Sequence, residues 1–99
     1  MRVLAFGAHP DDIEFRMAGT LAKYAARGDE VFMCVATNGE IGSYGMPRAE
    51  IAAMRHKEAQ ASADVIGAHL IWLGYEDEMI FDNRETRMAF IDVVRTARP

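Results

Sequence analysis

The stretch that decides the fold is Arg2–Asp12 (RVLAFGAHPDD), near the start of the 99-residue chain. Its first part, Arg2–Ala8, is a short apolar run, which predicts a strand buried on both faces. The run ends in the turn His9–Asp12 (HPDD), whose proline restrains the residue before it toward an extended conformation. A buried strand followed by a polar turn is typical of an open α/β sheet, in which ligands bind beyond the carboxyl ends of the strands.

The rest of the chain alternates short apolar runs with longer helical patterns, which indicates βαβ units. Further strands are predicted at Val31–Thr37 and His69–Leu73, and loops at Asn38–Met46 and, rich in acidic residues, at Gly74–Asn83. Three helices are predicted, from Ile13 to Arg27, from Pro47 to Gly67 and from Arg84 to Arg98. The stripes expected to face the sheet are Ile51, Met54, Glu58, Ala61 and Val65 on the second helix, and Met88, Ile91 and Val94/Arg95 on the third.

This alternation predicts an α/β fold, a Rossmann-like parallel sheet in three layers, α/β/α. Right-handed crossovers place the second strand beside the first and the third beyond it, in the order 3-2-1. The chain stops where such a fold would begin another strand. We therefore expect residues 1–99 to be the N-terminal half of one domain, with no second domain. The first strand is then an open edge, and we expect a homo-oligomer or a partner that covers it.

Composition excludes several classes of protein. Hydrophobic residues make up 51% and charged residues 26%, as in an ordinary globular protein, and the net charge of −4 argues against a nucleic-acid binder. The single cysteine, Cys34, cannot form a disulfide framework or a thiolate zinc cage and fits a reducing cytoplasm, the expected location. No run approaches the ~20 apolar residues of a membrane span, and we expect no secretion signal.

Three polar stretches follow the predicted strands: His9–Asp12, Thr37–Glu40 and Gly74–Asp77. The first holds one imidazole and two carboxylates within four residues. A histidine nitrogen and a carboxylate oxygen are ligands of catalytic zinc, and a second carboxylate would accept a proton from the bound water. The simpler interpretation is that Asp11 or Asp12 caps the following helix. The residues alone leave both interpretations open.

Ala8–Glu14 (AHPDDIE), followed by Gly19–Ala22 (GTLA), resembles the signature of the PIG-L/LmbE-like zinc-dependent N-deacetylases. The resemblance extends through Thr37–Gly42 (TNGEIG), Arg55-x-x-Glu58 and Leu73–Asp77, and so covers essentially the whole chain. It implies a hydrolase that uses metal-activated water to remove an acetyl or related acyl group. The implied substrate is a small N-acetylated sugar or glycoconjugate, such as an N-acetylglucosamine derivative.

The resemblance also implies roles for individual residues. His9 and Asp12 match two of the family's three protein ligands to zinc, and Asp11 matches its general base. Arg55 and Asp77 match positions near the substrate.

The family's third zinc ligand is a histidine in a later stretch, which is expected beyond Pro99. The isolated chain is therefore expected to bind zinc weakly and to be inactive. The alternative is an inactive fragment or half-domain that acts only as a folding or protein-interaction unit. His56, expected to face solvent, and His69, at the amino end of its strand, are not placed to replace the missing ligand.

Two further features bear on the resemblance. Where the family has glycines, this chain has Arg16 and Ala18, and Arg16 either narrows the pocket or points to solvent. Glu58 interrupts its apolar stripe, which favours a structural role, a pairing with Arg55 or a cap on a loop amide, over a functional role in steadying the Thr37–Gly42 loop. The sequence lacks the third-strand aspartate of a phosphoacceptor receiver domain and the G-x-G-x-x-G turn of a dinucleotide-binding domain.

Overall fold

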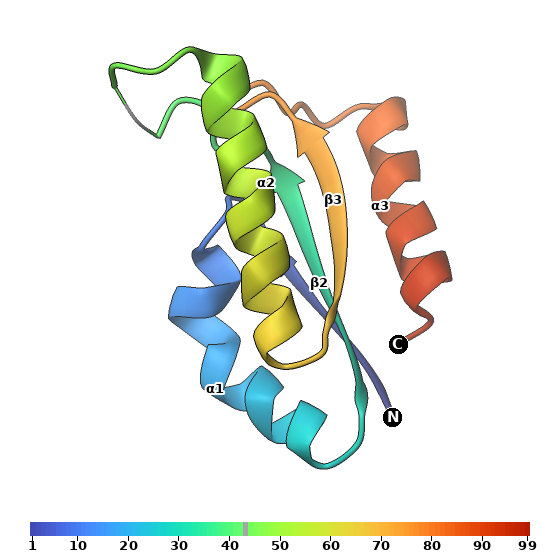
Figure 1. Cartoon of the computed structure of the whole chain (residues 1–99). Helices are drawn as coiled ribbons and strands as arrows, with labels where there is room; N and C mark the ends of the chain where they lie inside the picture. The colour runs from blue at the N-terminus through green and yellow to red at the C-terminus, as the bar shows by residue number, and fades with distance from the viewer. Residues whose placement is uncertain (43) are drawn as a thin grey trace.

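A computed structural model describes residues 1–42 and 44–99 and shows strands and helices in strict alternation (Figure 1). The order is β1 (Arg2–Gly7), α1 (Asp12–Ala26), β2 (Glu30–Thr37), α2 (Arg48–Val65), β3 (His69–Tyr75) and α3 (Arg84–Ala97). Every predicted element is confirmed, with small shifts at the ends. The predicted loop Asn38–Met46 is confirmed for its described residues, and Ser43 lies outside them.

The three strands form one parallel sheet with β2 in the centre. The helices α1 and α2 cover one face and α3 covers the other, as Figure 1 shows. The predicted fold class, layer arrangement and strand order are therefore confirmed, and within the described residues β1 is an edge strand. No helix in this part of the chain is long and apolar enough to span a membrane.

The core is built on β2. Val31, Met33 and Val35 pack on the side of α1 and α2, in one cluster with Ile13, Leu21 and Ala63. Because successive side chains of a strand point to opposite faces, the residues between them, Phe32, Cys34 and Ala36, face α3. All of these β2 side chains are buried. The strand is thus enclosed on both sides, as its apolar sequence predicts.

The predicted inward face of α2 is confirmed at Ile51 and wrong for its other residues. Met54 and Val65 are 43% and 83% exposed, whereas Ile51, Ala59 and Ala63 are buried. The small alanine side chains pack toward the sheet and leave the larger apolar residues outside. Glu58 is exposed and does not interrupt the buried stripe.

The predicted inward face of α3 is also wrong. Its buried residues are Thr86, Val93 and Ala97, whereas the predicted Met88, Ile91 and Val94 are each about two-fifths exposed. Phe90 lies on the inner side, where its ring centroid is 5.5 Å from that of Phe6 on β1. We call the exposed residues Met88, Ile91 and Val94 the outer α3 stripe.

The strand β3 is longer than predicted, since Gly74 and Tyr75 belong to it and not to the acidic loop. Gly74 adopts φ +70°, which glycine tolerates without strain. The pairing of β2 with β3 shifts register at this point, and Thr37 lies opposite Tyr75. The backbone N–H of Asn38 then donates to the Tyr75 carbonyl at 2.9 Å. This irregularity keeps the loops after β2 and β3 in contact.

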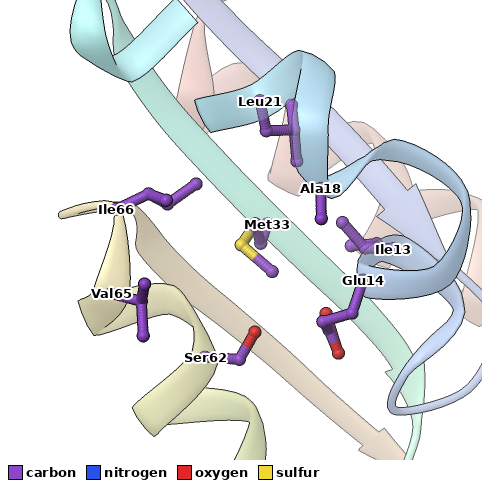
Figure 2. A pocket seen from close by; sticks show the side chains of 8 residues that line it. All are labelled: Ile13, Glu14, Ala18, Leu21, Met33, Ser62, Val65 and Ile66. Carbon is purple, nitrogen blue, oxygen red and sulfur yellow. The ribbon is translucent and has the colours of Figure 1, made fainter. Parts of the chain in front are cut away.

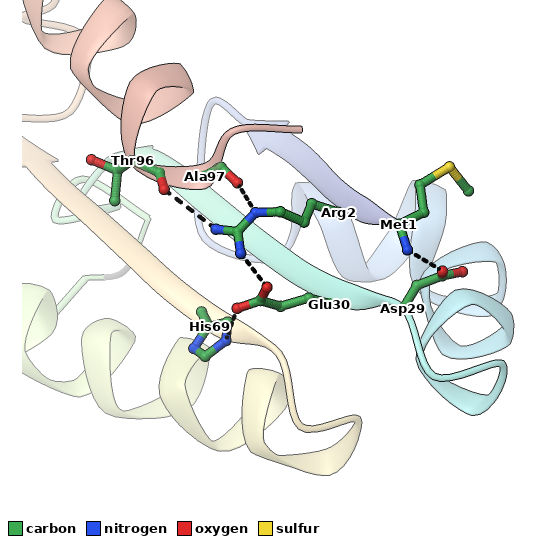
Figure 3. Close-up of polar contacts among 7 residues, drawn as sticks. All are labelled: Met1, Arg2, Asp29, Glu30, His69, Thr96 and Ala97. Atoms are coloured by element: carbon green, nitrogen blue, oxygen red, sulfur yellow. Dashed lines mark hydrogen bonds and ion pairs between the residues drawn. The ribbon is translucent and has the colours of Figure 1, made fainter.

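At the amino ends of the strands, Arg2 joins α3 to the sheet (Figure 3). Its Nε donates to the Ala97 carbonyl at 2.6 Å, its Nη1 pairs with Glu30, and its guanidinium lies 4.8 Å from the Phe32 ring centroid. His69 Nε2 is 3.1 Å from Glu30 Oε1. The hydrogen bonds from Arg2 to the Ala97 and Thr96 carbonyls supply partners that these groups lack within the helix.

Cys34 provides a test of the central position of β2. Its side chain is fully buried, and this burial raises the pKa of the thiol to about 11. Because the thiolate is the reactive form, we predict slow alkylation of the native protein at pH 8 and complete alkylation in guanidinium chloride. Mass spectrometry of samples taken over time measures both. Rapid, complete labelling of the native protein would contradict the enclosed strand.

Candidate active site

The predicted turn His9–Asp12 connects β1 to α1 at the carboxyl edge of the sheet. Asp11 occupies the N-cap position with φ +89°, but its side chain makes no capping hydrogen bond. The Asp12 carboxylate instead accepts a hydrogen bond from the backbone N–H of His9 at 2.8 Å. Neither carboxylate therefore caps the helix in the ordinary way. Left-handed backbone at a non-glycine residue is strained, and such strain is common at functional sites.

The imidazole of His9 lies between two carboxylates. Its Nδ1 is 3.5 Å from Asp12 Oδ2, and its Nε2 is 3.1 Å from Asp77 Oδ1. The side chains of His9 and Asp12 are about half exposed, whereas Asp77 is buried in the loop that follows β3. The structure thus brings together the turn after β1 and the loop after β3, two regions far apart in the sequence.

Arg55 reaches the turn from the inner side of α2. Its Nη2 donates to the Pro10 carbonyl at 2.6 Å and lies 3.3 Å from Asp11 Oδ2. The side chain is only 27% exposed. Arg55 therefore contacts the residue predicted to be the general base and holds the backbone beside it.

A cleft of about 280 Å³ opens beside this contact and is lined by Pro10, Asp11, Glu14, Arg55, Glu58 and Ala59. Burial raises the pKa of Glu14, and the negative charge of Asp11 acts in the same direction. No ion pair joins Glu58 to Arg55 among the described residues, so the predicted pairing of these two is wrong.

The loop after β2 packs against the same turn. Thr37 Oγ1 donates to the Ala8 carbonyl at 2.7 Å, and Asn38 Oδ1 accepts from the Glu40 backbone N–H at 3.1 Å. Gly39 has φ +68°, and a Cβ at this position would lie 3.1 Å from the Pro10 ring. The glycine thus permits a close approach of loop and turn. The sequence showed the glycine but gave no sign of its neighbour.

The other candidates lie away from the turn. His56 is exposed, as predicted, and stacks on Trp72 with ring centroids 4.6 Å apart. His69 lies at the amino end of β3. Arg16 is exposed on α1, in agreement with the alternative that it points to solvent.

An apolar cleft of about 160 Å³ separates α1 from α2 (Figure 2). Figure 2 shows Glu14 and Ser62 on opposite sides of it, with Met33 of β2 between the helices. The remaining lining is mostly aliphatic. This cleft carries none of the residues of the His9–Asp12 turn and is a packing gap between two helices.

His9 and Asp12 offer an imidazole nitrogen and a carboxylate oxygen as neighbours, which is the donor set of catalytic zinc. The buried Oδ1 of Asp77 has no hydrogen-bond partner within the described structure and faces the same histidine. His9 and Asp12 fit a zinc ion as two members of its coordination shell, and Asp77 lies behind the imidazole. Across residues 1–42 and 44–99, no group of three or more histidine, cysteine, aspartate or glutamate residues is arranged to hold a metal.

An open Rossmann-like sheet with a histidine–carboxylate turn beyond its carboxyl edge defines an α/β protein whose ligand site lies at the strand ends. Residues 4–99 match the model of the PIG-L family, described as GlcNAc-PI de-N-acetylase, and the chain belongs to this family. The predicted family is thereby confirmed.

The chain is similar to enzymes of two kinds. It is 34% identical to mycothiol S-conjugate amidase of Streptomyces coelicolor, over 78% of this chain and 29% of that protein. Its structure matches N,N'-diacetylchitobiose deacetylase from Pyrococcus horikoshii with a TM-score of 0.91 and 34% identity, over 98% of this chain and 38% of that one. It also matches GalB, the 4-carboxy-2-hydroxymuconate hydratase from Pseudomonas putida, with a TM-score of 0.89 and 26% identity, over 100% of this chain and 45% of that one. The chain spans less than half the length of each.

The close packing of Gly39 on Pro10 can be tested against a matched control. Gly67 has nearly the same backbone angle, φ +67°, but a Cβ there would meet open space. Both Gly39→Ala and Gly67→Ala place a side chain in the left-handed region, and only Gly39→Ala also crowds the turn. We predict that Gly39→Ala is less stable than Gly67→Ala by about 1–3 kcal/mol, measured by chemical unfolding. Equal losses would show that the loop does not pack on the turn.

Proposed function

We propose that this chain forms part of a zinc-dependent hydrolase that removes an acetyl or related acyl group from an N-acetylated amino-sugar-type substrate. The observation that carries the proposal is that the two neighbouring carboxylates of the turn face different partners. The Asp12 carboxylate faces His9, whereas the Asp11 carboxylate faces Arg55. Family membership and the similarity to two amide-cleaving enzymes support this choice.

His9 and Asp12 would hold the zinc ion, together with a further ligand expected outside residues 1–99. When bound, zinc supplies a Lewis acid that polarises the acyl carbonyl and lowers the pKa of water. The Asp11 carboxylate is half exposed, so that water can reach it. It would take the proton of the attacking water as general base and return it to the leaving amine.

Arg55 and Asp77 are proposed as residues near the substrate. Arg55 borders the open cleft beside Asp11, where its guanidinium can meet an acyl or hydroxyl oxygen. Asp77 is more restricted, because its Oδ1 is enclosed and faces His9. A substrate contact of Asp77 would have to use the other carboxylate oxygen.

The two aspartates of the turn should not be interchangeable. Asp12→Ala removes a ligand and should strongly reduce zinc affinity. Asp11→Asn should keep zinc but lower turnover roughly 10²–10⁴-fold, since it removes the proton acceptor. Zinc content by elemental analysis and amine release from N-acetylglucosamine derivatives measure the two effects in the full-length protein. If Asp11→Asn loses zinc while Asp12→Ala keeps it, the roles are reversed.

Hydration is a second candidate reaction, because the match to the hydratase covers the whole chain. Activation of water by Asp11 would serve both reactions, and they differ in the bond that water attacks. Acetate release identifies a deacetylase, whereas loss of the ultraviolet absorbance of an unsaturated acid without acetate identifies a hydratase. If the zinc-loaded full-length protein shows neither activity, that result favours the alternative, a half-domain that acts only in folding or interaction.

We further propose that a polypeptide of residues 1–99 self-associates through the free side of β1 and the outer α3 stripe. One side of β1 has no paired strand among the described residues, and the stripe exposes three large apolar side chains. Unpaired strand edges and exposed apolar patches both favour association. Light scattering should give a mass above 11.0 kDa that falls toward the monomer in the triple variant M88S/I91S/V94S. A stable monomer at high concentration would contradict the proposal.

A further inference from the structure

Asp77 is the least exposed carboxylate near the turn, at 7%. Its Oδ1 has no hydrogen-bond partner within the described part of the chain, although His9 Nε2 lies only 3.1 Å away. Burial of a carboxylate oxygen without a hydrogen bond costs free energy, because hydrogen bonds to water are given up and none replaces them. The distance to Nε2 is within hydrogen-bonding range, so a small rotation of the imidazole gives Asp77 the partner it lacks.

The two nitrogens of His9 face different groups. Nε2 faces Asp77, and Nδ1 lies on the side of Asp12, at 3.5 Å from Oδ2. That Oδ2 already accepts the backbone N–H of His9 at 2.8 Å. In a neutral imidazole one nitrogen donates and the other accepts. With the proton on Nε2, the ring donates to the buried carboxylate, and the lone pair of Nδ1 remains on the side of Asp12. The opposite tautomer would set the Nε2 lone pair against a buried negative charge.

We propose that Asp77 is a positioning residue that accepts a hydrogen bond from Nε2–H of His9 and thereby fixes Nδ1 as the metal-binding nitrogen. The inference rests on the proposed zinc function. Histidine ligands commonly donate their second ring N–H to a carboxylate, which sets both tautomer and orientation. Because Oδ1 of Asp77 is enclosed, this role differs from contact with a sugar, which requires an exposed oxygen.

Nuclear magnetic resonance of the metal-free full-length protein, labelled with ¹⁵N-histidine, tests the tautomer directly. At pH 8.5 we expect a pyrrole-type shift for Nε2 of His9, a pyridine-type shift for Nδ1, and a ring proton that exchanges slowly with water. The signal is assigned by its loss in His9→Gln. In Asp77→Ala the ring proton should exchange rapidly, and Asp77→Asn, whose carbonyl can still accept, should restore slow exchange in part. Glu76→Gln is the matched control, since it removes an exposed charge from the same loop and should leave His9 unchanged.

Zinc titration provides the second readout. We expect Asp77→Ala to weaken zinc binding about 10–100-fold, Glu76→Gln to have no effect, and Asp12→Ala to cause a larger loss. A proton on Nδ1 of wild-type His9, or the same proton exchange in wild type and Asp77→Ala, would overturn the proposal. So would a zinc loss in Asp77→Ala as large as in Asp12→Ala with an unchanged tautomer, which would make Asp77 a direct ligand. If Asp77→Ala does not fold, the wild-type tautomer and Asp77→Asn decide. Absence of zinc binding by the wild-type protein would refute the zinc function while leaving the tautomer result readable.

Discussion

The burial of β2 on both faces is the constraint on which the rest of the structure depends. Because α1 and α2 cover one face and α3 the other, the strand must be apolar along its length and must lie in the centre of the sheet. Parallel pairing on both sides then brings the carboxyl ends of all three strands to one edge. The segments that follow the strands are polar, so the candidate site residues lie together at this edge, just beyond the apolar core.

At that edge, two side chains from distant parts of the sequence fix the turn after β1. Arg55 binds the Pro10 carbonyl and faces Asp11, and Asp77 faces the imidazole of His9. The left-handed backbone of Asp11 costs of order 1–3 kcal/mol and persists only where surrounding contacts hold it. These contacts turn the Asp11 carboxylate toward Arg55 and the His9 imidazole toward Asp77. A site built in this way is organised before any ligand arrives.

Much of this arrangement could be predicted from the sequence. Strand order, layers and the polar edge follow from Arg2–Ala8 and the alternation after it, since apolar periodicity and the handedness of crossovers leave few options. Most of each inward helix face was predicted incorrectly, because helical spacing offers more than one stripe and does not show which one packs on the sheet. In α2, the small Ala59 and Ala63 pack inward while Val65 stays outside, which depends on how closely a helix approaches the sheet. Local pattern carries no information on that distance.

The partners of the site residues were also beyond the sequence alone. The motif and its resemblance predicted His9, Asp11 and Asp12 as a group, and the structure places them in one turn. The contact between Arg55 and Pro10 depends on how α2 lies against the turn. The contact of Asp77 with His9 depends on where the loop after β3 lies. Both depend on tertiary geometry that the spacing of residues along the chain does not encode.

We propose that the turn after β1 binds a metal ion and that Arg55 and Asp77 orient its side chains. Anomalous diffraction at the zinc edge, from crystals of the full-length protein grown with zinc, tests this most directly. The account predicts a peak within bonding distance of both His9 and Asp12, with Asp11 turned away from the metal toward Arg55. A peak at His56 or His69 with none at the turn, or a zinc ion bound by Asp11 and not by Asp12, would contradict it.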